Sequence, residues 1–386
     1  MNPDRRMGAL ETIEPISTAD PPPAAATRPI RVLHCIHALS GGGAERQLAL
    51  LLGASLAHGM TAAVCCLVPG DRPMPGVTVY SRPRRHRYDP VAFALVRDAV
   101  EHFRPDLLHA WLPPSTTIPA MLVGRAKGVP VVFSYRTAMR FRRPLTVAEF
   151  ATAAACVAGV VANSPAGNAS RWYQALFWCK RGAVIPNAVR IPPEQRKQSY
   201  RQRGDGPLRL LFVGRLTAAK NWPCLIRALP LIDGRIDWRL EICGDGEDRV
   251  AAERFAASLA LADRVRFLGA RDDAIQLMRR ADILLLPSLW EGMPNALVEG
   301  FAVGVPCIAS DIPAHRWLAA GVDCLAYFDP GSPASLADAI ATVADRYGAA
   351  VTRTVAARAI AHGLDVDSMA RRYLGYYHLL LGPGTA

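Results

Sequence analysis

Short apolar runs rich in β-branched residues alternate with longer amphipathic segments, and this alternation occurs twice along the 386 residues. It predicts βα units and an α/β fold, because parallel strands are joined by crossover connections that are usually helices. Strands are expected in the first half at 30–36, 61–67, 107–110, 130–134, 158–162 and 182–186. Helices are expected between them at about 43–58, 89–103, 115–127, 144–155 and 165–178.

A polar stretch, 190–207, interrupts the alternation with proline, glycine and charged residues that show no periodicity, which indicates a linker. Strands are expected beyond it at 208–213, 238–243, 264–268, 282–286 and 305–309. The predicted limits are 1–28 for a flexible tail, 29–190 and 208–365 for two α/β domains, 191–207 for the linker and 366–386 for a C-terminal helix. Ligands of parallel sheets bind beyond the carboxyl ends of the strands, so the turns after strands are the candidate site.

The chain is basic, with 45 Lys and Arg against 33 Asp and Glu and a net charge of +12. Apolar residues make up 51% of it and charged residues 20%, which excludes an intrinsically disordered protein. The excess charge suits nucleic acid, a membrane surface or an acidic substrate. No RNA-recognition, KH or helix-turn-helix signature accompanies it, so a nucleic-acid partner is not expected.

The nine cysteines form no C-x-x-C pair, and several lie in apolar runs, which favours buried thiols in a reducing compartment. The first 28 residues lack the apolar core of a signal peptide. The nearest approach to a membrane span, 150–162, is too short and rich in alanine. No His, Cys and carboxylate cluster has metal-ligand spacing. A cytoplasmic protein without a bound metal is therefore expected.

The first predicted strand leads into a run of three glycines that includes Gly42 and Gly43, directly before a helix. Glycines let backbone N–H groups approach a ligand closely, and a helix N-terminus favours an anion. The run is not G-x-G-x-x-G, so the dinucleotide fingerprint is absent. Phosphate or sugar binding is predicted here, with a plain tight turn as the alternative.

A pair of basic residues, Arg215 and Lys220, follows the strand expected at 208–213. A fork-shaped guanidinium and a compact ammonium suit a diphosphate. Two basic residues are more often only solvated, but their place after a central strand favours a functional role.

Two carboxylates, Glu291 and Glu299, follow the strand at 282–286, one in a loop and one in the helix after it. Two domains joined by a linker imply a cleft between them. Both carboxylates can face this cleft and accept hydrogen bonds from the vicinal hydroxyls of a sugar or ribose. The segment Gly292-Met293-Pro294-Asn295 places backbone donors ahead of the helix N-terminus, and Asn295 is the expected N-cap. At 365–367, by contrast, Asp-Val-Asp is expected to cap a helix rather than to bind a metal.

In this order, the motifs resemble those of the retaining glycosyltransferases of family 4, whose GT-B fold consists of two facing Rossmann-like domains with an interdomain cleft. The resemblance covers about 30–382. The matching segments are Gly42 to Glu45, Val161 to Ser164, Ile185 to Asn187, Val213 to Lys220, and the Glu–seven residues–Glu motif from Glu291 to Glu299.

The resemblance implies a role for each site residue. Arg215 and Lys220 would hold the donor diphosphate, Glu299 the ribose and Glu291 the transferred sugar. Further donor contacts would come from Gly42, Gly43, Gly269, Ala270, Gly292, Met293, Pro294 and Asn295. Fixed cations and helix N-termini would stabilise the leaving group without a metal or any other cofactor. The last helix would cross back onto the N-terminal domain.

One position departs from the family pattern. Many members have a histidine near the reacting sugar carbon where this chain has Arg136. Arginine cannot act as a general base at ordinary pH, so Arg136 is expected to stabilise phosphate or sugar oxygens. His109, near the end of the strand at 107–110, is a candidate contact on the acceptor side, with a purely structural histidine as the alternative.

The predicted function is transfer of a hexose from a nucleoside-diphosphate sugar, with a UDP-sugar as the leading candidate, to a glycan or lipid-linked acceptor in cell-surface polysaccharide or glycolipid synthesis. A non-catalytic nucleotide-sugar-binding protein and a GT-B epimerase are the alternatives. Basic clusters at 82–87 and 136–143 suit an anionic acceptor or the inner face of the membrane, against the alternative of a solvated surface.

Overall fold

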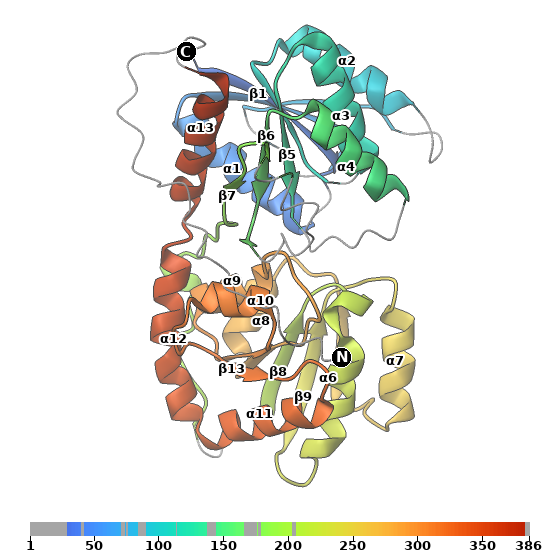
Figure 1. The fold of residues 1–386 in the computed structure, drawn as a ribbon. Helices are drawn as coiled ribbons and strands as arrows, with labels where there is room; N and C mark the ends of the chain where they lie inside the picture. The colour runs from blue at the N-terminus through green and yellow to red at the C-terminus, as the bar shows by residue number, and fades with distance from the viewer. Residues whose placement is uncertain are drawn as a thin grey trace, which may run out of the picture.

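The computed structural model describes residues 29–39, 42–70, 74, 76–83, 90–112, 114–136, 144–165, 176, 179–202 and 206–382. The expected tail at 1–28, most of the expected helix at 165–178, and the arginines at 84–87 and 140–143 lie outside these ranges. The described residues form two α/β units, one above the other in Figure 1.

The N-terminal unit is built on a seven-stranded sheet with the strand order β3-β2-β1-β4-β5-β6-β7, and every pair is parallel. Its strands are β1 (Ile30–Ala38), β2 (Met60–Val68), β3 (Thr78–Ser81), β4 (Leu107–Ala110), β5 (Val131–Tyr135), β6 (Gly159–Ala162) and β7 (Ala183–Val184). Its helices are α1 (Gly43–Ala57), α2 (Val91–Phe103), α3 (Pro114–Lys127) and α4 (Pro144–Cys156).

The C-terminal unit is built on a six-stranded parallel sheet with the order β10-β9-β8-β11-β12-β13. Its strands are β8 (Leu208–Val213), β9 (Trp238–Cys243), β10 (Val265–Gly269), β11 (Ile283–Leu286), β12 (Cys307–Ser310) and β13 (Ala326–Phe328). Its helices are α6 (Trp222–Ala228), α7 (Arg249–Ser258), α8 (Ala274–Arg280), α9 (Asn295–Val303), α10 (Pro313–Ala319), α11 (Pro333–Asp345) and α12 (Tyr347–His362), with short 3₁₀ turns η2 (Pro193–Gln195), η3 (Ala218–Lys220) and η4 (Leu229–Ile232).

Both sheets are doubly wound, which confirms the predicted fold class. The strand order reverses between β1 and β4 in one sheet and between β8 and β11 in the other. In such sheets the crevice beyond the carboxyl ends of the strands at this reversal is the ligand site. The architecture therefore points to the turns after these four strands.

Two strands were not expected from the sequence, and both lie at a sheet edge. β3 is largely exposed, and β13 has only three residues. An edge strand has only one hydrogen-bonded neighbour and is often short, so it lacks the long apolar run that marks a central strand. The sequence pattern therefore reveals the inner strands and misses these two.

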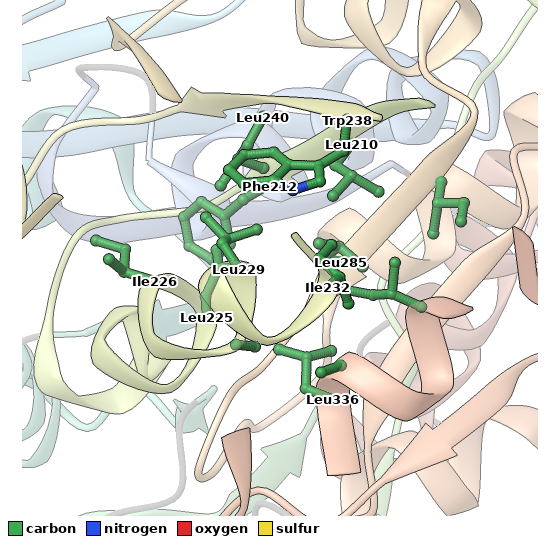
Figure 2. Packing of buried hydrophobic residues seen from close by; sticks show 14 of the residues in the cluster. Leu210, Phe212, Leu225, Ile226, Leu229, Ile232, Trp238, Leu240, Leu285 and Leu336 are labelled. Atoms are coloured by element: carbon green, nitrogen blue, oxygen red, sulfur yellow. The ribbon is translucent and has the colours of Figure 1, made fainter. Parts of the chain in front are cut away.

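The core of the C-terminal unit lies between the sheet and the helices α6 and α11 (Figure 2). Alternate side chains of β8 and β9, including Leu210, Phe212 and Leu240, point into it. Trp238 is fully buried there, and its indole N–H donates to Asp233 at 3.0 Å. The polar edge of the ring is thus satisfied while its apolar body packs.

The last helix, α13 (Val366–Leu381), returns to the N-terminal unit and packs beside α1 (Figure 1). It buries Tyr373, Tyr376 and Tyr377 in the same core as strands β1 and β2. The carboxylate of Asp365 accepts the Ser368 backbone N–H at 2.8 Å. The predicted helix cap is thereby confirmed.

The polar stretch between the sheets packs on the C-terminal unit. Lys197 donates its ammonium protons to the carbonyls of Arg279 at 2.9 Å and Ala281 at 2.8 Å, close to the end of α8. Burial lowers the pKa of Lys197 to about 8. Tyr200 also donates its hydroxyl to the carbonyl of Gly304 at 2.9 Å. Lys197 and Tyr200 therefore attach this stretch to the C-terminal unit.

Glu149 is a buried acid in the N-terminal core, and it gives this unit a pH-dependent stability. The Thr117 hydroxyl donates to its carboxyl, but burial dominates and raises its pKa from 4.5 to about 7. The folded state then holds a proton that the unfolded state has lost between pH 4.5 and 7, so stability falls as the pH rises through this window.

We predict that Glu149→Gln removes this pH dependence. Relative to the variant, the wild type should lose about 3 kcal/mol between pH 4.5 and pH 8, since each pKa unit corresponds to about 1.4 kcal/mol. Thermal unfolding of both proteins across that range measures the difference. Curves that stay parallel would contradict the assignment.

Candidate active site

Two glycine turns at the carboxyl ends of β8 and β9 pack against each other. Gly244 has φ +146°, and a Cβ atom on it would lie 1.9 Å from the Gly214 carbonyl oxygen. Leu216 donates its backbone N–H to the carbonyl of Asp245 at 3.0 Å. Only glycine fits at 244, and the resulting contact fixes the turn from which Arg215 emerges, exposed to solvent.

An ion pair joins Lys220 and Glu291 in the structure. The resemblance implies that the first holds the donor diphosphate and the second the transferred sugar. The Ser288 hydroxyl donates to the same Glu291 carboxylate at 2.7 Å. A backbone bond of 2.9 Å from Leu289 to Ala219 joins the two loops that carry them. The ammonium and the carboxylate therefore hold each other beside the turn of Arg215.

The loop after β11 contains Gly292, Met293 and Pro294 and leads into α9. Asn295 is the first residue of this helix and not its N-cap, which is Pro294 without a side-chain cap. The Asn295 amide oxygen instead accepts a hydrogen bond from the side chain of Asn187. The asparagine thus bridges to the N-terminal unit, which the sequence did not indicate.

Glu299 lies in the second turn of α9, and Arg46 of α1 reaches it across the cleft at 3.2 Å. Burial raises the pKa of Glu299, and the Arg46 guanidinium partly offsets this shift. Within the described residues its second carboxylate oxygen has no hydrogen-bond partner. Sequence reasoning missed Arg46, because an arginine on the surface of a helix carries no signal of its own.

The N-termini of α1 and α9 meet across the cleft. α1 has Gly42 as its N-cap and Gly43 as its first residue. A Cβ atom on Gly43 would lie 2.8 Å from the side-chain amide nitrogen (Nδ2) of Asn295. Each helix start has unpaired backbone N–H groups and a partial positive charge. Two such starts facing one another form a seat for an anion.

Arg136 follows β5 and faces the same region. Its guanidinium lies 4.7 Å from the centre of the Trp111 ring, a cation–π contact. It donates to the Tyr373 hydroxyl at 3.1 Å and to the amide oxygen of Asn187. Arg136 is therefore linked through Asn187 to the loop and helix start at 293–295.

His109 does not reach the cleft, so its expected contact with the acceptor is corrected. The imidazole is fully buried and bonded at 2.7 Å to both Tyr377 and Ser134. Burial, with help from the nearby His34 and Arg136, holds its pKa well below the usual range. His109 is buried because α13 covers this part of the sheet, and Tyr377 of that helix forms a hydrogen bond with the Nδ1 atom of the imidazole.

Gly269 and Ala270 lie at the same edge of the C-terminal sheet as the glycine turns. β10 ends at Gly269, which has φ +71°, and the Gly244 N–H donates to its carbonyl at 2.8 Å. Ala270 is exposed just beyond. The turns after β8, β9 and β10 therefore form one continuous rim, as parallel strands require.

Among the described residues, no three His, Cys, Asp or Glu side chains are arranged to bind a metal ion. Over the same residues, none of the helices combines the length and apolar character needed to cross a membrane.

Family models match both halves of the chain. Residues 41–191 match the model described as "Glycosyltransferase Family 4", and residues 207–346 match the one described as "Glycosyl transferases group 1". The first match begins after β1 and the second ends before α12, so together they cover most of the two sheet units, in order.

Two relatives show how far the similarity extends. The lipopolysaccharide core biosynthesis glycosyltransferase LpsE of Rhizobium meliloti is 26% identical over 297 residues, 75% of this chain and 81% of its own length. The UDP-Gal:alpha-D-GlcNAc-diphosphoundecaprenol alpha-1,3-galactosyltransferase of Escherichia coli is 33% identical over 147 residues, 35% of this chain and only 38% of its own length.

Solved structures share the fold. The Anabaena protein Alr3699/HepE, crystallised in complex with UDP-glucose, superposes with a TM-score of 0.74 at 22% identity, covering 90% of this chain and 99% of that one. WaaG, a glycosyltransferase involved in lipopolysaccharide biosynthesis, has a TM-score of 0.70 at 16% identity, with coverage of 89% and 99%.

We predict that Gly244→Ala destabilises the C-terminal unit by more than the cost of a left-handed backbone, because the added methyl group meets the carbonyl of Gly214. Gly234→Ala is the matched control, since Gly234 has φ +74° but open space around its Cβ position. The control should cost about 1–2 kcal/mol. Equal losses of thermal stability in the two variants would rule out the proposed contact between the turns.

Proposed function

Because the chain belongs to the group 1, family 4 glycosyltransferases, we propose that it moves a hexose from a nucleoside-diphosphate sugar to a glycan or lipid-linked acceptor with retention of configuration. The observation that carries this proposal is the approach of the α1 start to the start of α9, the helix of Glu299, together with the Lys220–Glu291 pair in the turns beside it. Gly214, next to Arg215, packs against the Lys220 side chain. Cations and helix starts suit a diphosphate, and a buried carboxylate suits a ribose.

The proposed mechanism uses the charges already present in the cleft. The diphosphate gains negative charge as the sugar leaves, and fixed positive groups stabilise that change. Lys220 would exchange Glu291 for a phosphate oxygen, which frees the carboxylate to accept hydrogen bonds from the sugar. Arg215 and the two helix starts complete the seat. In this scheme no metal ion or other cofactor takes part, since protein groups supply the positive charge.

Retention is proposed as a front-face attack, in which the acceptor hydroxyl passes its proton to the departing phosphate. This route needs no protein nucleophile. It also agrees with Arg136 at the position where many family members have a histidine, because a guanidinium can stabilise oxygens but cannot take a proton.

A UDP-sugar is the proposed donor. The Anabaena protein with the same fold was crystallised with UDP-glucose, and the Escherichia coli relative is named for a UDP-galactose donor. Both LpsE and WaaG are named for lipopolysaccharide biosynthesis. These names support an acceptor in a cell-surface polysaccharide or glycolipid.

The N-terminal unit offers a basic, partly apolar groove that fits such an acceptor at a membrane surface. Exposed Phe93, Arg82, Arg97 and Lys127 line it. The three cations share two acids, since Arg82 and Arg97 both pair with Asp98 and Lys127 pairs with Glu101, which leaves an excess of positive charge. Basic side chains beside exposed apolar ones favour an anionic bilayer, so contact with the inner face of the membrane is part of the proposal.

The first test is sugar transfer from UDP-sugars, with the product read by mass spectrometry. Arg215→Ala should lower kcat by about 10²- to 10³-fold, as loss of one preorganised charge-stabilising group does. Glu299→Gln should raise the donor KM by about ten- to a hundredfold through weaker ribose hydrogen bonds. Arg239→Ala removes an exposed arginine elsewhere on β9 and should leave both constants unchanged.

The outcomes of this test separate the alternatives. Tight binding of UDP-sugar without turnover on any acceptor would favour a non-catalytic binding protein. Conversion of the donor to an epimer without acceptor would favour a GT-B epimerase. Unchanged transfer by both site variants would overturn the site assignment.

The membrane contact predicts binding to vesicles that contain anionic lipid. The triple variant Arg82→Gln, Arg97→Gln, Lys127→Gln should lose most of this binding, because each cation near the surface contributes about 1 kcal/mol. Sedimentation with phosphatidylglycerol vesicles measures the loss, and transfer to a soluble acceptor should be retained. Equal sedimentation of variant and wild type would disprove the contact.

A further inference from the structure

We propose that Tyr373 of α13 is a positioning residue for Arg136, so that the returning C-terminal helix is a working part of the active site. The proposal rests on the proposed function, since it concerns the orientation of a guanidinium toward the donor.

Arg136 is held by three groups that come from distant parts of the chain. The Trp111 ring lies below the guanidinium at 4.7 Å, the Tyr373 hydroxyl accepts one N–H at 3.1 Å, and the Asn187 amide oxygen accepts another. These two bonds use two of the five donors of the guanidinium. The side chain is only partly buried, so its other donors can meet a ligand.

Asn187 places this guanidinium relative to the loop at 292–294, which is called the donor loop below because the proposed donor lies against it. Its backbone N–H donates to the Met293 sulfur at 3.0 Å, and its side chain donates to the amide oxygen of Asn295. Arg136 and the start of α9 therefore share one partner. Any change in the orientation of the guanidinium alters its distance from the seat of the diphosphate and sugar.

Tyr373 is suited to this role because α13 does not need its hydroxyl to stay attached. The single hydroxyl proton of Tyr376 is within hydrogen-bond distance of two backbone carbonyl oxygens, that of Arg181 at 2.6 Å and that of Val160 at 3.2 Å. Tyr377 is bonded to His109 at 2.7 Å. All three tyrosines are buried. Of their three hydroxyl groups, that of Tyr373 is the one hydrogen-bonded to Arg136 in the described part of the chain.

The expected consequence is kinetic. A long arginine side chain that loses one of its fixed partners samples more rotamers, and the cost falls on the step that needs a precise orientation. Groups that meet charge developing in the transition state change kcat more than ground-state binding. Loss of the Tyr373 hydroxyl should therefore lower kcat while the donor KM changes little.

The experiment compares Tyr373→Phe with Tyr376→Phe, two removals of a buried hydroxyl from one helix. Tyr373→Phe should lower kcat about tenfold with the donor KM within about twofold, as the loss of a hydrogen bond to a charged group would do. Tyr376→Phe should leave kcat unchanged, and thermal unfolding reports any loss of stability in either variant. In an Arg136→Ala background, Tyr373→Phe should have no further effect on kcat.

A second measurement keeps this proposal separate from the proposed function. Side-chain NMR of ¹⁵N-arginine-labelled protein follows the Arg136 Nε–H signal, assigned by its absence in Arg136→Lys. Tyr373→Phe should shift this signal and increase its mobility, whereas Tyr376→Phe should not.

The two failures then look different. A wild-type chain that transfers no sugar refutes the proposed function, while the NMR signal still decides the positioning role. An Arg136 signal unaffected by Tyr373→Phe overturns the positioning role whatever the activity. The positioning role is also overturned if Tyr373→Phe lowers kcat by the same factor in the wild type and in the Arg136→Ala background.

Discussion

The site depends on the close approach of the starts of α1 and α9, with Gly43 set directly against Asn295. Two helix starts of the same partial charge repel one another unless negative charge lies nearby. In the structure Glu45, in the first turn of α1, places its carboxylate beside Gly42, and two paired carboxylates, Glu299 with Arg46 and Glu291 with Lys220, lie nearby. In the proposed mechanism a diphosphate replaces the carboxylates as partner of the cations, and the carboxylates then accept hydrogen bonds from the hydroxyls of the sugar and the ribose.

The contacts across the cleft are polar, and this sets them apart from the rest of the packing. Arg46 pairs with Glu299, Asn187 with Asn295, and the Ser164 hydroxyl donates to the carbonyl of Gly292. Polar contacts of this kind are typical of interfaces between domains of one chain. α13 is held differently, since its tyrosines are part of the apolar core of the N-terminal unit. This helix is therefore a structural part of that unit.

The inner strands and the glycine turns could be predicted from the sequence, because buried parallel strands are continuous apolar runs and turns need special residues. The partners of Arg46 and the burial of His109 could not be predicted, because they depend on contacts between distant parts of the folded chain. Arg46 finds its partner only when the two units face each other. His109 was expected at the cleft because it ends a strand, but α13 covers it and Tyr377 takes one of its ring nitrogens. Such tertiary contacts leave no local pattern.

Arg136 shows why the helix returning from the end of the chain matters to the chemistry. A histidine at this position would be a short, rigid ring, whereas an arginine has four rotatable bonds and needs external support to present a fixed charge. The structure supplies that support from Trp111 on one side and from Tyr373 and Asn187 on the other. One of these groups belongs to the helix and another to the segment that contacts the donor loop. The partners that fix the orientation of Arg136 therefore come together only in the two-domain fold. A cation that is to stabilise developing charge needs such a fixed orientation, and a solvated surface charge lacks it.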